Sequence, residues 1–148
     1  MKAVVQRVSR GEVRVAGEVV GRIDHGMVVL LGVLDGDGPE DARRLAAKLA
    51  SFRFFEDPDG RMNLAAGQVG AGALVVSQFT LAADGRKGRR PSFDRAAAPE
   101  LAEPLYEAFC AHLREAGLEV ETGRFGAAME VELVGDGPVT FVLEEAPA

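Results

Sequence analysis

The stretch Met27-Val28-Val29-Leu30-Leu31-Gly32-Val33-Leu34 carries no polar side chain. A strand with one face in water alternates apolar and polar residues, whereas a strand covered on both faces is apolar throughout. Residues 27–34 therefore predict a strand at the centre of a sheet. The segments His25-Gly26 before it and Asp35-Gly36-Asp37-Gly38 after it are typical of turns and bound the strand.

Outward from this strand, the N-terminal segment has the alternation of a β-hairpin. Residues 4–8 and residues 12–15 mix valines with polar side chains at strand spacing, and Ala16-Gly17 follows as a turn. The return strand ends at His25-Gly26.

Two later segments change to helical spacing. The first begins near Pro39, and the second runs from Pro99 to Gly117, a residue type common at helix ends. Each has one apolar stripe, which must cover the sheet. The residues of the stripes are Ala42, Leu45, Ala46, Leu49 and Ala50 in the first helix, and Leu101, Leu105, Ala108, Phe109, Leu113 and Ala116 in the second.

The remaining segments predict further short strands. Residues 52–55 and the strand from Leu74 precede a closing hairpin, in which residues 129–133 and 139–143 pair across a turn at residues 135–138. Strands joined mainly by hairpins, with two helices, predict an α+β fold with a mostly antiparallel, barrel-like sheet. We expect one domain over residues 1–148, with disorder only after Leu143.

Composition excludes several classes of function. At 47% hydrophobic and 27% charged residues the chain is typical of a globular protein, and no apolar run approaches the roughly 20 residues of a membrane span. Residues 1–7 lack the apolar region of a secretory signal, so we expect a cytoplasmic protein without a membrane partner. The single Cys110, with His25 and His112, favours neither a disulfide nor a metal site. No glycine-rich segment matches a nucleotide fingerprint, so we expect no cofactor.

A polar cluster beside a cationic loop gives the strongest functional signal. Residues 77–80, Ser-Gln-Phe-Thr, follow an apolar strand, and residues 85–90, Gly-Arg-Lys-Gly-Arg-Arg, follow shortly after. The loop holds 4 of the 17 basic residues of a chain whose net charge is -6. Clustered cations on an acidic protein suit a phosphate-bearing substrate, although a solvated surface loop has the same pattern. The acidic total argues against DNA binding.

Nothing in the sequence supplies a base for a nucleophilic Ser77 or Thr80. His25 lies in a predicted turn and His112 within a predicted helix, where structural roles are the common ones. Gly137-Pro138 follows Gly-Asp in a place where a cis peptide is plausible, although composition alone favours trans.

Several motifs, taken together, resemble one family, the D-aminoacyl-tRNA deacylases. The resemblance covers essentially the whole chain in collinear order, and its combination of motifs is specific. The motifs are Ala3-Val4-Val5-Gln6-Arg7-Val8, Phe55-Glu56-Asp57 with Met62-Asn63-Leu64, Val76-Ser77-Gln78-Phe79-Thr80-Leu81, Arg86-Lys87-Gly88-Arg89-Arg90-Pro91-Ser92-Phe93, Gly123-Arg124-Phe125-Gly126 with Met129, and Gly137-Pro138-Val139-Thr140.

The resemblance implies hydrolysis of the ester that joins a D-amino acid, or achiral glycine mischarged on tRNA(Ala), to the 3′ adenosine of tRNA. It implies a homodimer with active sites at the subunit interface, where a cis Gly-Pro pair of one subunit excludes L-side chains from the other's pocket. Carried over by motif, the catalytic residues are Ser77, Gln78, Phe79 and Thr80, the chiral selector is Gly137 with Pro138, the adenosine contacts are Phe125 and Met129, and the tRNA phosphate contacts are Arg86, Lys87, Arg89 and Arg90.

The sequence is compatible with two mechanisms. The resemblance favours assistance by the substrate's 2′-hydroxyl while main-chain amides around Ser77, Gln78 and Phe79 hold the carbonyl; the alternative makes Thr80 a nucleophile. Two other classes also fit the residues: an RNA-binding module without turnover, and a serine hydrolase of small esters, which would need a base near Ser77. The chain departs from the family pattern at Gly135, where asparagine is usual, and at Ala82 and Gly85, where tyrosine and threonine are common.

Overall fold

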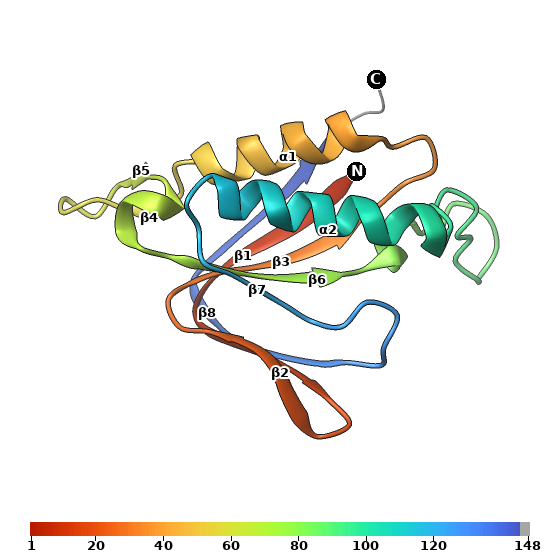
Figure 1. Ribbon diagram of the computed structural model, residues 1–148, viewed down its shortest axis with the longest axis horizontal. Helices are drawn as coiled ribbons and strands as arrows, with labels where there is room; N and C mark the ends of the chain where they lie inside the picture. Colours follow the sequence, from red (N-terminus) through yellow and green to blue (C-terminus); the bar gives the residue numbers. More distant parts are fainter. Residues whose placement is uncertain (146–148) are drawn as a thin grey trace.

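The computed structural model describes residues 1–145 and contains two α-helices, eight strands and two short 3-10 helices within them (Figure 1). The predicted α+β class is confirmed. In chain order the elements are β1 (Lys2–Val15), β2 (Glu18–Ile23), β3 (Gly26–Gly32), α1 (Pro39–Ser51), β4 (Phe55–Glu56), β5 (Met62–Leu64), η1 (Ala66–Val69), β6 (Gly72–Ser77), η2 (Phe79–Ala82), α2 (Pro99–Glu115), β7 (Val120–Thr122) and β8 (Glu130–Glu144).

The main sheet has the order β2-β1-β3-β6-β7, and β8 pairs with β1. Strand β3 lies between β1 and β6, with all its residues but Leu30 buried, as its apolar sequence predicts. The pairs of β1 with β2, β3 and β8 are antiparallel, but β3 with β6 and β6 with β7 are parallel. The sheet is therefore mixed, because the long connections through α1 and α2 return the chain in the same direction.

The sheet curls until its ends nearly meet, which gives the barrel-like shape. Strand β2 at one end of the order contacts β7 at the other. A Cβ added at Gly21 would lie only 2.3 Å from the carbonyl oxygen of Thr122, so this approach requires glycine. Inside the curl, the sheet's second face packs as a small apolar cluster of Val8, Val13, Ile23, Val28, Leu74 and Val76.

Both helices cover the other face of the sheet (Figure 1). The predicted stripe of α1 is buried at Ala42, Leu45, Ala46 and Leu49. In α2, Leu105, Phe109 and Leu113 are buried as predicted, but Leu101 is 42% exposed. Of the two helices, α2 contributes to a pocket that lies between its first turn and the end of β6.

The predicted closing hairpin is wrong. Residues 130–144 form one strand, β8, which pairs with β1 along residues 2–14. Its register shifts between the pairs Gln6 with Thr140 and Val8 with Gly135, so that four residues of β8, 136–139, lie opposite Arg7 alone. The glycines and proline that are typical of a turn form a wide bulge here, because β1 is long enough to pair with both halves.

The predicted disorder after Leu143 is also wrong for the next two residues. Glu144 belongs to β8, and the main-chain nitrogen of Glu145 donates to the Met1 carbonyl oxygen at 2.9 Å. Residues 146–148, on which the rest of that prediction falls, lie outside the described part of the chain. Within residues 1–145, no helix is both long and apolar enough to cross a membrane.

Candidate active site

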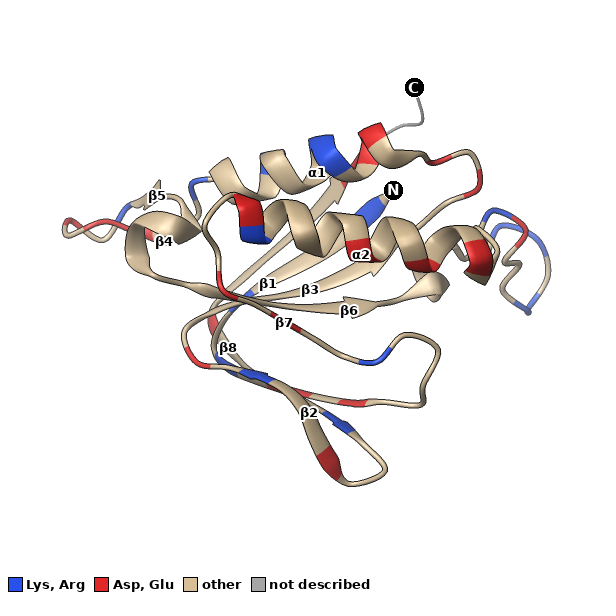
Figure 2. Ribbon diagram, viewed as in Figure 1, with Lys and Arg blue, Asp and Glu red and all other residues tan. Residues whose placement is uncertain are grey.

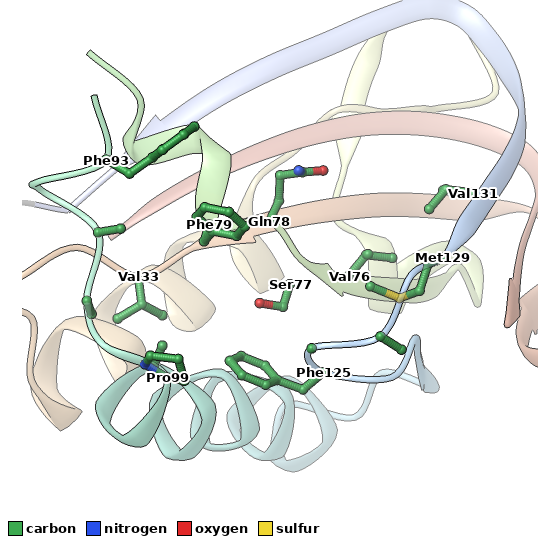
Figure 3. A pocket seen from close by; sticks show the side chains of 15 residues that line it. Val33, Val76, Ser77, Gln78, Phe79, Phe93, Pro99, Phe125, Met129 and Val131 are labelled. Atoms are coloured by element: carbon green, nitrogen blue, oxygen red, sulfur yellow. The ribbon is translucent and has the colours of Figure 1, made fainter. Parts of the chain in front are cut away.

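A pocket of about 600 Å³ opens where β6 ends against α2 and the segment between β7 and β8 (Figure 3). Parallel pairing of β6 with β3 and β7 brings these distant segments together. Five sequence-predicted residues line the pocket together: Ser77, Gln78, Phe79, Phe125 and Met129. The other lining residues are Val33, Val76, Phe93, Ala96, Ala97, Pro99, Ala102, Gly126, Ala127 and Val131.

The main chain at the end of β6 turns directly into the 3-10 helix η2. The Gln78 amide donates to the Leu31 carbonyl oxygen at 2.8 Å, which fixes the exit of the strand. Phe79 and Thr80 open η2, and the first N–H groups of a helix have no acceptor within it. Their amides are thus suited to bind an oxyanion, whereas the Gln78 amide is already occupied.

The Thr80 side chain is exposed and accepts a hydrogen bond from Gln78 Nε2 at 2.6 Å. It is not among the residues that line the pocket. The lining residues also include no histidine, aspartate or glutamate. His25 instead lies edge-on to the Phe55 ring, and His112 lies 3.4 Å from Glu115 on α2. The described residues therefore offer no side-chain base at the pocket.

Phe125 and Met129 reach the pocket from the segment between β7 and β8. The Phe125 ring packs against Tyr106 of α2, with ring centroids 5.9 Å apart. Met129 Sδ accepts a weak hydrogen bond from the Arg124 amide at 3.4 Å and lies close to Gly123. An aromatic ring and a thioether on apolar walls suit a flat heteroaromatic ligand such as a nucleobase.

The cationic loop lies near the N-terminal end of α2 (Figure 2), and Phe93, which follows the loop in sequence, lines the pocket. Asp84 and Ser92 exchange two main-chain hydrogen bonds of 2.8 Å each. The Asp84 carboxylate accepts hydrogen bonds from the guanidinium and from the main-chain amide of Arg86. These bonds, chiefly those from the guanidinium, lower the pKa of Asp84 to about 2. The exposed Lys87, Arg89 and Arg90 have no carboxylate within ion-pair distance among residues 1–145. Three cations are thus available to an anionic ligand.

Gly137-Pro138 lies outside this pocket, exposed in the bulge of β8, and its peptide bond is cis. The buried Arg7 supports the bulge: its Nε donates to the Asp136 carbonyl oxygen, and its Nη1 donates to the Phe54 carbonyl oxygen at 2.9 Å. Sequence reasoning assigned Arg7 no role. Its position on the same face of β1 as the buried Ala3 and Val5 is the feature of the sequence that indicates a buried, partnered cation.

Comparison with known proteins identifies the family. A family model described as D-Tyr-tRNA(Tyr) deacylase matches residues 4–144. The chain belongs to this deacylase family. The family and enzyme class implied by the sequence motifs are thereby confirmed.

Curated relatives of this deacylase are similar over almost their full length. A protein of Anaeromyxobacter dehalogenans named D-aminoacyl-tRNA deacylase is 62% identical over 97% of both chains. One of Thermus aquaticus with the same name is 56% identical over 99% of this chain and 96% of its own. The match to the family model, over residues 4–144, spans the positions of all the candidate residues.

Two solved structures share the fold of the deacylase. One, titled c-Myc DNA Unwinding Element Binding Protein, is 39% identical with a TM-score of 0.92 over 99% of each chain. Another, titled as a probable eukaryotic D-amino acid tRNA deacylase, is 20% identical with a TM-score of 0.83 over 96% of this chain and 97% of its own. The second likeness supports the fold alone.

Proposed function

We propose that this protein hydrolyses the ester bond of D-aminoacyl-tRNA to give free tRNA and the D-amino acid. Glycyl-tRNA mischarged on tRNA(Ala) is a second substrate, because glycine has no side chain to exclude. The observation that carries the proposal is the pocket in which Ser77, Gln78 and Phe79 lie with Phe125 and Met129. We place the terminal adenosine against Phe125 and Met129, and the ester carbonyl at the start of η2.

The mechanism needs no side-chain base. Water adds to the ester carbonyl, the amides of Phe79 and Thr80 stabilise the oxyanion, and the 3′ oxygen leaves with a proton. The 2′-hydroxyl of the substrate assists that proton transfer. Thr80 positions Gln78 through their 2.6 Å hydrogen bond. Ser77, half-buried at the pocket wall, positions the ester.

Selection against L-amino acids is proposed to depend on a second copy of the chain. Gly137 and Pro138 are exposed and do not line their own pocket, so they are available to the pocket of a partner in a homodimer. Val134 and Val142 leave β8 with exposed apolar side chains outside the pocket, which favours burial of this strand between subunits. Main-chain oxygens near Gly137 would then exclude an L-side chain by sterics.

The cationic loop is proposed to bind tRNA phosphates through Arg86, Lys87, Arg89 and Arg90. We propose that residues 1–148 act as one deacylase domain in the cytoplasm, where aminoacyl-tRNA is used, without a cofactor. Neither a membrane nor DNA is a partner in this proposal.

The test is hydrolysis of matched D- and L-tyrosyl-tRNA, with glycyl-tRNA(Ala) as a third substrate. We expect rapid release of D-tyrosine and glycine and no release of L-tyrosine above the uncatalysed rate. Binding of tRNA without turnover would instead identify an RNA-binding module. Equal hydrolysis of both tyrosyl esters would identify a general esterase.

A further inference from the structure

Two large aromatic side chains stand exposed at one end of the pocket. Phe79 is 57% exposed and Phe93 is 36% exposed, and their ring centroids lie 5.2 Å apart at an interplanar angle of 62°. Figure 3 shows both rings at one end, with Met129 at the other. They come from different segments, since Phe79 opens η2 and Phe93 follows the cationic loop. The proposed mechanism uses the main-chain amide of Phe79 but neither of the two aromatic rings.

The aromatic pair lies at the base of the cationic loop. Phe93 is adjacent to Ser92, whose main chain pairs with Asp84 to close that loop. Sites for single-stranded nucleic acid combine these two elements, because cations follow the phosphates while aromatic rings stack the bases. Lys87, Arg89 and Arg90, which have no ion-pair partner within residues 1–145, therefore favour a nucleic-acid ligand over an uncharged apolar one.

The pocket itself has room for one nucleoside with its amino acid. Its volume of about 600 Å³ lies within the range of small-molecule sites. If the terminal adenosine lies against Phe125 and Met129, the nucleotide that precedes it lies outside the pocket. The RNA backbone then passes from there to the cationic loop, where its phosphates bind. The aromatic pair forms part of the pocket wall, and Phe93 is the lining residue that follows the loop in sequence.

We propose that Phe93, supported by contact with the Phe79 ring, stacks the base of the nucleotide that precedes the terminal adenosine of the tRNA. This inference rests on the proposed function. The enzyme then recognises an unpaired 3′ end of at least two nucleotides rather than aminoacyl-adenosine alone. Stacking tolerates any base, so the contact selects single-stranded RNA ends without reading their sequence.

The test uses three D-tyrosyl esters: of adenosine, of the dinucleotide CpA, and of the same dinucleotide with an abasic first position. We expect kcat/KM for CpA to exceed that for the abasic dinucleotide by about tenfold, as base stacking on an aromatic ring supplies. This comparison holds phosphate contacts constant and uses the unaltered protein. The adenosine ester gives the baseline without a second nucleotide.

Variants assign the contact to the ring. Phe93→Ala and Phe93→Leu should both reduce the ratio of CpA to abasic activity to nearly one, whereas Phe93→Trp should keep it. Loss in the leucine variant separates stacking from simple apolar contact. Met62→Ala is the matched control, because Met62 is 54% exposed on β5 outside the pocket, and it should leave the ratio unchanged.

Three results would overturn the proposal. Equal activity on CpA and abasic esters, while D-tyrosyl-tRNA is still hydrolysed, would refute stacking and leave the proposed function standing. Dissociation of a dimer into monomers in Phe93→Ala, by light scattering, would show that a second copy covers the ring. Failure of the unaltered protein to hydrolyse any D-tyrosyl ester would refute the proposed function itself.

Discussion

Arg7 fixes the position of Asp136 across 129 residues of sequence: its Nε lies 3.2 Å from both the carbonyl oxygen and the carboxylate of Asp136. Arg7 is 4% exposed, and its guanidinium also donates to the carbonyl oxygen of Phe54. One side chain thus joins β1, the segment before β4 and the bulge of β8. The bulge carries Gly137, so Arg7 controls a proposed selector that it does not itself form.

Replacement of Arg7 by lysine should therefore damage stability and activity together. Lysine keeps the charge but loses the planar fork that binds two carbonyl oxygens at once. We expect Arg7→Lys to lower the free energy of unfolding by about 1.5–3 kcal/mol, measured by urea denaturation. Deacylation should fall by about tenfold or more, because small misplacements at an active site are costly.

The matched control is Arg10→Lys on the same strand. Arg10 has an exposed side chain paired with Glu132, so its replacement should change stability by less than about 1 kcal/mol. Equal effects of the two substitutions would contradict the anchoring role of Arg7.

Thr80→Ala should keep substantial activity, since the Thr80 hydroxyl binds Gln78 and the described part of the chain places no base beside it. Loss of one hydrogen bond is worth about 0.5–1.5 kcal/mol, so kcat should fall by no more than about tenfold. A substrate that ends in 2′-deoxyadenosine should react at least about 100-fold more slowly, because proton transfer by its 2′-hydroxyl is lost. A trapped acyl-Thr80 ester, or an inactive but folded Thr80→Ala protein, would establish the nucleophilic mechanism instead.

The cationic loop should set the salt dependence of tRNA binding. Removal of the four cations together should reduce the slope of log Kd against log salt concentration by about 0.7–0.9 for each phosphate contact that is lost. The four residues are Arg86, Lys87, Arg89 and Arg90. Singly, Arg89→Ala should change the slope more than Arg86→Ala, because Arg86 is held by Asp84. Lys48→Ala on α1 removes the same charge away from the pocket and should leave the slope unchanged. An unchanged slope in the quadruple variant would make the loop a solvated surface segment.

Cys110 should resist thiol reagents while the protein is folded. Burial raises the pKa of its thiol from 9.0 to about 11. Two pKa units reduce the thiolate fraction near pH 8 by about 100-fold, and only thiolate reacts with iodoacetamide. The raised pKa also means that the stability contribution of the neutral thiol is complete below pH 9.0 and is lost as the pH rises through about 11. Labelling at equal rates in native and urea-unfolded protein would contradict this.

The local sequence pattern predicted the positions of the helices and strands better than it predicted which strands pair. The apolar run of β3 and the stripe of α1 each determine burial by themselves, so their positions followed from sequence. The continuity of β8 did not, because residues 135–138 are locally typical of a turn. The bulge there depends on pairing with β1 and on contacts of Arg7, which local sequence does not contain.

The candidate site was predictable to the extent that its motifs are contiguous. Ser77, Gln78 and Phe79 lie next to one another, but their approach to Phe125 depends on the parallel pairing of β6 with β7. Parallel strands are joined by long connections, so no short-range signal specifies that pairing. Sequence also could not show that the Gln78 amide is occupied by Leu31, which moves the expected oxyanion contacts to the start of η2.

Gly123→Ala should impair substrate binding by displacing Met129. A Cβ added at Gly123 would lie 2.7 Å from Met129 Sδ, closer than real contacts allow, and 3.5 Å from Val13. The thioether is flexible, so we expect the protein to fold with a stability loss of about 1–3 kcal/mol and with Met129 moved within the pocket. KM for D-tyrosyl-tRNA should rise while kcat changes little, because the ester chemistry at η2 is untouched. Gly67→Ala is the control, since its added Cβ meets nothing within 4 Å.

A double-mutant cycle of Gly123→Ala with Met129→Ala tests whether the clash between Cβ and Sδ is the cause. If it is, Gly123→Ala should have little further effect on KM once the thioether is absent. Additive effects of the two substitutions would place the cause elsewhere in the segment between β7 and β8.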